Sequence, residues 1–179
     1  MRHGIRRVSI DEICRKANVS KMTFYKHFPN KIELAKYIVI QLNEDAMVEY
    51  RSIMEANIPY VEKVQQIVDM KICITENMSQ EFFNELTLDS LSEIHDLLIR
   101  YRQANMQAII DDFSKAQQKG DIRQDIHPQF LLYILNKIIE MSTDKQLLLL
   151  YDSPKKITAE LVKFFFYGIV AQSNQRQGA

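Results

Sequence analysis

Residues 9–34 read SIDEICRKANVSKMTFYKHFPNKIEL, and this stretch decides the fold of the N-terminal part of the chain. It opens with a Ser-Ile-Asp-Glu capping box, which predicts a short helix over residues 10–17. Ser20 is placed to cap a second short helix over residues 21–27. Asn30 follows a proline that stops this helix, and apolar residues at helical spacing then predict a long third helix. Two short helices joined by a turn, with a long helix after them, form the plan of a helix-turn-helix.

The rest of the chain is expected to be helical too. Only four Gly and four Pro interrupt the 179 residues, and apolar positions recur at helical spacing. The punctuated stretch from Asn57 to Pro59 separates a head over 1–56, with its connecting helix, from a body over 57–179. Helices are predicted in the body over about 60–77, 79–88, 90–119, 127–141 and 153–172. The expected fold class is all-α, with an N-terminal helix-turn-helix head on a C-terminal helical bundle.

The charges are distributed unevenly, although the formal net charge is zero. Residues 1–36 hold nine Lys/Arg and three Asp/Glu, whereas the remaining residues hold 14 Lys/Arg and 20 Asp/Glu. A basic head on an acidic body suits a protein that meets a polyanion with one end only. Charge alone leaves open the alternative of a chance cluster of solvated basic side chains.

The second short helix carries the groups that can bind duplex DNA. A helix in this position enters the major groove, where Lys21 can reach a guanine and Met22 a thymine methyl group. The N-terminus of the first helix adds backbone N–H groups for a phosphate. A core aromatic role is the alternative for Tyr25, which we interpret as exposed to the groove. The predicted DNA-contacting residues are Ser9, Lys21, Met22, Thr23, Tyr25, Lys26, His27 and Lys31.

This stretch resembles the helix-turn-helix of the tetracycline-repressor (TetR) family, in which the turn typically reads Ala-Gly-Val-Ser and the recognition helix Lys-Gly-Thr-Leu-Tyr-x-Tyr/His-Phe. Here residues 17–28 read ANVSKMTFYKHF, with Met22 where the family usually has Gly. A further family helix precedes the position of Gly4, and we expect that helix to be missing from this chain. The resemblance implies that the DNA-contacting residues face the groove or its phosphates, and that four apolar residues pack the head: Val19, Phe24, Phe28 and Leu34.

The resemblance also implies a homodimer formed through the last two helices, so that two recognition helices read a palindromic operator. It further implies a small molecule bound within the helical body. Flexible, aromatic and soft side chains suit such a pocket, although an ordinary packed core is the alternative for each of them. The predicted ligand-binding residues are Cys73, Phe82, Phe83, Tyr101, Tyr133 and Asn136.

The sequence contains no pattern typical of an enzyme or a metal site, such as HExxH, Gly-x-Ser-x-Gly or a Gly-rich phosphate loop. Cys14 and Cys73 lie far apart without CxxC spacing, which argues against a metal site and for the reducing cytoplasm. His95 and His127 lack a Glu three residues before them and are interpreted as structural. No leader is expected, and no apolar run approaches the ~20 residues of a membrane span. We therefore expect no enzyme activity, cofactor, metal or membrane association.

These observations together predict a cytoplasmic, ligand-responsive repressor. It would bind double-stranded operator DNA and leave it when an unidentified small-molecule effector binds the body. DNA affinity that falls steeply with salt would favour this hypothesis. The alternative is a helical ligand-binding or interaction protein that has lost DNA binding with its first helix.

Overall fold

The computed structural model describes residues 4–76, 79–87, 92–142 and 144–170, and the nine named elements within these ranges are all α-helices. They are α1 (Ile10–Ala17), α2 (Lys21–His27), α3 (Lys31–Glu55), α4 (Tyr60–Glu76), α5 (Gln80–Thr87), α6 (Ser92–Lys119), α7 (Pro128–Met141), α8 (Lys145–Leu148) and α9 (Pro154–Ile169). The predicted all-α class is confirmed. The four-residue α8 was not predicted. The predicted helix limits at Asn77, Leu88, Ser90 and Gln172 lie outside the described residues.

The two short helices of the head begin at the predicted residues because their caps form. The side chains of Ser9 and Ser20 each accept from a backbone N–H three residues later, at 3.2 and 3.0 Å. Between the helices, Asn18 has φ 54° and ψ 44°, the left-handed conformation that Asn tolerates better than most residues. The next N–H then donates to the carbonyl of Cys14 at 3.0 Å, which closes α1.

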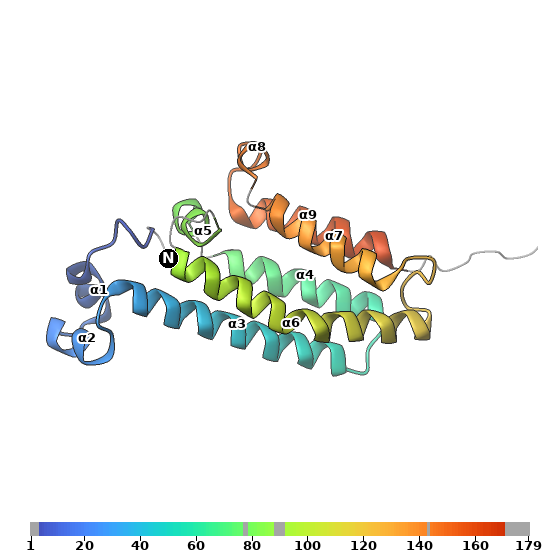
Figure 1. Cartoon of the computed structure of the whole chain (residues 1–179), viewed down its shortest axis with the longest axis horizontal. Coiled ribbons are helices and arrows are strands. Elements are labelled where there is room, and N and C mark those ends of the chain that lie inside the picture. The colour runs from blue at the N-terminus through green and yellow to red at the C-terminus, as the bar shows by residue number, and fades with distance from the viewer. Residues whose placement is uncertain (1–3, 77–78, 88–91, 143, 171–179) are drawn as a thin grey trace, which may run out of the picture.

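The long helix α3 runs from the head into the body (Figure 1). Its N-cap is Asn30, whose side chain accepts from the backbone N–H groups of the second and third following residues at 2.8 and 3.0 Å. Its first half supplies Ala35 and Val39 to a buried cluster that also contains Ile5, Phe82 and Ile94. Its second half supplies Tyr50 and Ile53 to the main core of the body. A displacement of α3 would therefore move the head relative to the body. The boundary after residue 56 stays a prediction.

The body is a bundle in which α4 packs most extensively against α9, while α6 packs against α3 and α7 (Figure 1). Val64, Val68 and Ile157 are fully enclosed at the centre of its core. The helices α7 and α9 lie side by side and leave large apolar side chains exposed, which are Phe130, Tyr133, Met141, Phe164 and Tyr167. Burying this surface would be favourable, since apolar area removed from water stabilises by roughly 25 cal/mol per Å².

The described part of the chain has neither a metal-binding group nor a membrane-spanning helix. Within residues 4–76, 79–87, 92–142 and 144–170, no group of three or more His, Cys, Asp or Glu side chains could hold a metal ion. None of the helices in these ranges is long and apolar enough to cross a membrane.

Candidate nucleic-acid interface and ligand cavity

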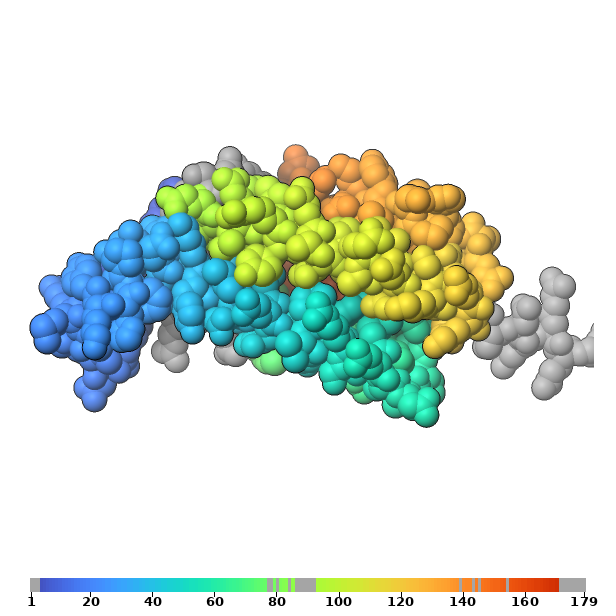
Figure 2. Space-filling view, turned by 60° about the horizontal axis from the view of Figure 1, so that its bottom comes forward, coloured from blue at the N-terminus to red at the C-terminus, as the bar shows by residue number. Residues whose placement is uncertain are grey.

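The outer face of α2 carries exposed side chains of the kind that contact DNA. Met22 is 82% exposed and Tyr25 54% exposed, although both are large and apolar or aromatic. Lys26 and His27 are exposed at the end of the same helix. Figure 2 shows the head at one end of the molecule, projecting beyond the body. The residues of α2 are therefore accessible to a partner as large as a DNA duplex.

The inner face of α2 is fixed by aromatic packing. Phe24 is buried, with its ring centroid 5.4 Å from that of Tyr25 and 6.0 Å from that of Phe28. Phe28 in turn lies 5.6 Å from Tyr37 of α3, centroid to centroid. The expectation that Phe24 and Phe28 pack the head is met. The expectation for Val19 was wrong, because this side chain lies at the turn and is 41% exposed.

Two of the predicted DNA-contacting residues of α2 also make contacts within the head, one to α1 and one to the N-cap of α2. The Lys21 ammonium pairs with Asp11 of α1 at 2.6 Å, and both side chains remain largely exposed. The Thr23 hydroxyl lies 2.9 Å from the Ser20 hydroxyl, so these two groups share a hydrogen bond. Exposed ion pairs are weak, and Lys21 can exchange its carboxylate for a DNA group at small cost.

Lys31 is engaged inside the head. Its ammonium donates to the backbone carbonyl oxygens of Arg6 and Val8 at 2.7 and 3.0 Å. It thereby fixes the segment that leads into α1 against the start of α3. These bonds use two of the three N–H donors of the ammonium, which leaves one for a phosphate. The sequence could not reveal this role, since it depends on a contact across more than 20 residues.

The head is attached to the body through α5. The backbone N–H groups of Ile5 and Arg6 donate to the carboxylate of Glu85, the second at 3.3 Å. Phe82, one turn earlier on α5, packs with Ile5 in the buried cluster shared by the head and α3. The segment before α1 is thus held by a polar and an apolar contact from the same short helix.

An apolar cavity of about 250 Å³ lies inside the body. In Figure 2 the spheres of α6 and α3 leave a small gap, behind which the C-terminal helix is visible. Side chains from α3, α4, α5, α6, α7 and α9 surround the cavity. They are Ala46, Met47, Tyr50, Ile67, Lys71, Phe83, Ile109, Phe113, Leu135, Ile138, Ser142, Thr158, Leu161, Val162, Phe165 and Phe166.

Of the six predicted ligand-binding residues, Phe83 alone lines this cavity. Phe82 points instead into the buried cluster with Ile5, and Tyr133 is exposed on α7. Cys73 is exposed beside a shallow hollow between α3 and α4. Asn136 lies in a groove between α6 and α7, and Tyr101 is half-buried on α6. The structure does not bring the six residues into one pocket, because they lie on different faces of their helices.

Lys71 lines the cavity and was not predicted. It lies on α4 four residues after Ile67 and four before Thr75, both of which are buried, although Lys71 itself is exposed. It lines the cavity despite this exposure, and desolvation by the surrounding protein lowers the pKa of Lys71 below its ordinary value. A lysine at helical spacing within an apolar stripe is the sequence signal that would have revealed it.

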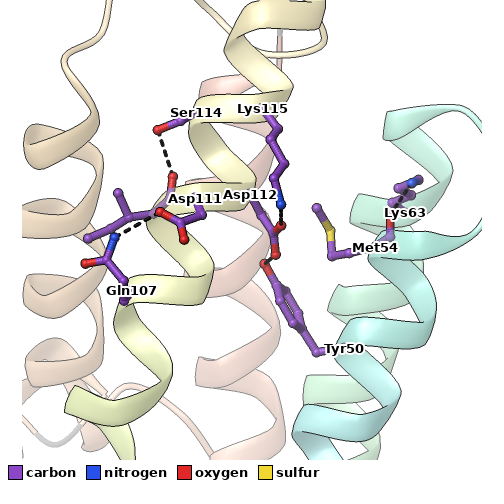
Figure 3. A network of polar contacts seen from close by, with 9 residues as sticks. Tyr50, Met54, Lys63, Gln107, Asp111, Asp112, Ser114 and Lys115 are labelled. Atoms are coloured by element: carbon purple, nitrogen blue, oxygen red, sulfur yellow. Dashed lines mark hydrogen bonds and ion pairs between the residues drawn. The ribbon is translucent and has the colours of Figure 1, made fainter.

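A polar network lies beside the cavity, between α3 and α6. Figure 3 shows the Tyr50 side chain reaching from α3 towards Asp112 on α6, where its hydroxyl donates to the carboxylate at 3.2 Å. Lys115 pairs with the same carboxylate at 3.5 Å. Burial, followed by the negative charge of Asp112, raises the pKa of Tyr50 well above its ordinary value, so this hydroxyl stays protonated. Tyr50 therefore connects the wall of the cavity to a fixed point on α6.

The exposed recognition-type helix, the long connecting helix and the hollow bundle define a helix-turn-helix protein with a separate all-helical body. Comparison with known proteins agrees with this class. Residues 1–38 match the family of bacterial regulatory proteins described as the tetR family. The chain is 27% identical over 133 residues to the HTH-type transcriptional regulator UidR of Escherichia coli K12, a match that covers 70% of this chain and 64% of UidR.

Solved structures show the same fold over nearly the whole chain. A putative TetR-family regulator from Rhodococcus sp. has a TM-score of 0.62 and 23% identity, covering 90% of this chain and 88% of its own. The fatty acid degradation regulator FadR from Bacillus halodurans has a TM-score of 0.64 and 14% identity, covering 98% and 90%. Residues 1–38 thus resemble the TetR family, and the fold of the chain is similar to that of TetR-family regulators.

Proposed function

We propose that the protein is a transcriptional repressor that binds a palindromic operator through α2 and is released by a small molecule in the body. The observation that carries this proposal is the continuity of α3. This helix begins directly after the exposed α2, and further along it supplies Ala46, Met47 and Tyr50 to the wall of the cavity. A ligand in the cavity therefore touches the same helix that positions the head.

The relatives support the regulatory part of the proposal. UidR is named a transcriptional regulator, and FadR a regulator of fatty acid degradation. A protein of this kind works in the cytoplasm, where bacterial DNA is. The basic head supplies a reason for DNA as the partner, since Lys and Arg neutralise phosphates and release counterions.

A homodimer through α7 and α9 is part of the same proposal. Phe164 is 77% exposed on α9, and Tyr133 and Tyr167 are about half exposed on the neighbouring surface. Large apolar side chains gathered on two adjacent helices favour burial against a second copy. A two-fold dimer presents two α2 helices to half-sites about 34–36 Å apart, in successive major grooves.

Two routes connect the cavity to the head. Along α3, a ligand that displaces Tyr50 would disturb its bond to Asp112 and shift the helix. Along α5, a ligand that displaces Phe83 would move the helix that holds Ile5 through Glu85 and Phe82. A coupling free energy of about 1–3 kcal/mol between ligand and DNA is enough for a useful switch.

The test begins with selection of DNA from a random pool by the purified chain. We expect enrichment of a palindrome and binding that weakens steeply as salt rises. Lys26→Ala should weaken binding to all sequences and lower the salt slope by about one per head, because Lys26 is placed to contact phosphate. Lys119→Ala, which removes an exposed lysine at the far end of α6, is the matched control and should leave binding unchanged. A pool in which no sequence is enriched would contradict the proposal.

A further inference from the structure

We infer that the ligand of the cavity is a small apolar molecule with a carboxylate or similar anionic group, held by Lys71. This inference rests on the proposed function only in treating the cavity as the effector site. Its basis is the chemistry of the cavity wall.

The wall is almost entirely apolar. Phe83, Phe113, Phe165 and Phe166 contribute aromatic surface, and most of the remaining lining residues are aliphatic. Tyr50 is polar, but its hydroxyl is already bonded to Asp112. Such a wall favours a hydrocarbon or aromatic body in the ligand, because binding removes apolar surface from water on both sides.

Lys71 is the single charged side chain of this wall, and it lacks a counterion. Across the described ranges 4–76, 79–87, 92–142 and 144–170, no carboxylate pairs with its ammonium and no hydrogen bond from that ammonium is present. An ammonium beside an apolar wall is less well hydrated than one in open water, and this desolvation lowers the pKa of Lys71. An anionic group on the ligand would supply the missing partner.

The sign of this charge excludes other ligand classes. A cationic ligand would meet repulsion from Lys71 in an apolar surrounding, where screening by water is weak. A neutral ligand could accept a hydrogen bond from the ammonium but would supply no opposite charge. A carboxylate forms a charge-assisted hydrogen bond with the ammonium, which is stronger than a bond between neutral groups.

The volume of the cavity limits the size of the ligand. A hollow of about 250 Å³ holds about eight groups of the size of water, at roughly 30 Å³ each. Octanoate, with its eight carbons and one carboxylate, is a probe of this size. 1-Octanol and octylamine have the same number of carbons, with a neutral and a cationic end.

The experiment is calorimetric titration of the purified chain, without DNA, with octanoate, 1-octanol and octylamine. We expect octanoate to bind at least about tenfold more tightly than 1-octanol, and octylamine not to bind. Lys71→Met should remove the preference for octanoate, and Lys71→Arg should keep it. Lys119→Met is the control for loss of a distant lysine, and thermal unfolding of each variant shows that it is folded.

Three results would overturn the inference: equal affinity for octanoate and 1-octanol, unchanged octanoate affinity in Lys71→Met, or no binding of octanoate up to millimolar concentration. Since the titration contains no DNA, its outcome is independent of whether a palindrome is enriched. A negative titration would therefore contradict the inferred ligand class but not DNA binding, and a failed DNA selection would not contradict the ligand class.

Discussion

Phe82 and Phe83 are neighbours on α5 but face different interiors. Phe82 packs with Ile5 and Val39 where the head meets α3, whereas Phe83 lines the cavity of the body. The short helix α5 thus packs against the head through Phe82 and forms part of the cavity wall through Phe83. Under the proposed function, this arrangement would connect an event in the cavity to the predicted DNA-contacting residues of the head.

Substitution of these two residues should separate stability from ligand response. Phe82→Ala is expected to lower the free energy of unfolding by about 3–5 kcal/mol, since it removes a buried aromatic side chain. Phe83→Leu should leave DNA affinity without ligand nearly unchanged and raise the ligand concentration needed for release. Chemical unfolding and fluorescence anisotropy with labelled operator measure the two effects. Equal effects of the two changes on release would contradict the division of roles.

Lys31 should act mainly through the structure of the head. Lys31→Met removes the bonds to the carbonyl groups of Arg6 and Val8, and we expect a loss of about 1–3 kcal/mol of stability, because charged donors make the stronger hydrogen bonds. Lys26→Met, on the exposed face of α2, should leave stability within ±0.5 kcal/mol and weaken DNA binding. Thermal unfolding of both variants is the measurement. A stable Lys31→Met protein would show that these bonds contribute little.

Lys71 should reduce the stability of the ligand-free protein. Its pKa is lowered from 10.5 by desolvation, so below that lowered pKa both the folded and unfolded chains carry its proton, and the folded chain bears the cost of the partly desolvated charge. Above it the unfolded chain binds more protons, and stability rises with pH until 10.5 is reached. Lys71→Met is expected to raise Tm, by roughly 2–4 °C for each kcal/mol gained.

The control for this prediction is its pH dependence. The gap in unfolding free energy between Lys71→Met and wild type should be largest at low pH and narrow as pH rises, because all other titrating groups are shared. A gap that widens with pH, or a variant less stable than wild type throughout, would mean that Lys71 has a partner in solution.

Phe164 should be required for assembly. Phe164→Glu places a charge on the exposed apolar surface of α9, where burial against a second copy would be unfavourable. We expect a folded monomer by analytical ultracentrifugation and loss of tight binding to a palindrome. Glu160→Gln, one turn earlier on α9 and also exposed, is a control that should remain dimeric. A dimer that persists in Phe164→Glu would place the interface elsewhere.

The sequence predicted the local elements well. The capping residues Ser9, Ser20 and Asn30 fixed three helix starts, because each cap depends on contacts within three residues. The exposure of Met22 and Tyr25 followed from the same local plan. Such features need no knowledge of how distant segments pack.

The features that depend on tertiary packing were harder to predict from the sequence. Phe82 and Phe83 are equivalent in composition, and which of them faces the cavity depends on how α5 lies against α3. Lys31 was expected at a phosphate, and its bonds to the segment before α1 arise only when the head folds. The spacing of Lys71 within the apolar stripe of α4 is visible in the sequence. The cavity that it lines is formed by six helices and could not be predicted from local patterns.

The most direct test of the account is the affinity of the protein for the selected palindrome as a function of half-site spacing. At physiological salt we expect the palindrome to bind about 10³-fold or more tightly than scrambled DNA. Insertion of five base pairs between half-sites, about half a helical turn, should abolish this preference because the two α2 helices would then meet opposite faces of the duplex. Equal affinity for the palindrome, the spaced duplex and scrambled DNA would contradict the claim that paired α2 helices read an operator.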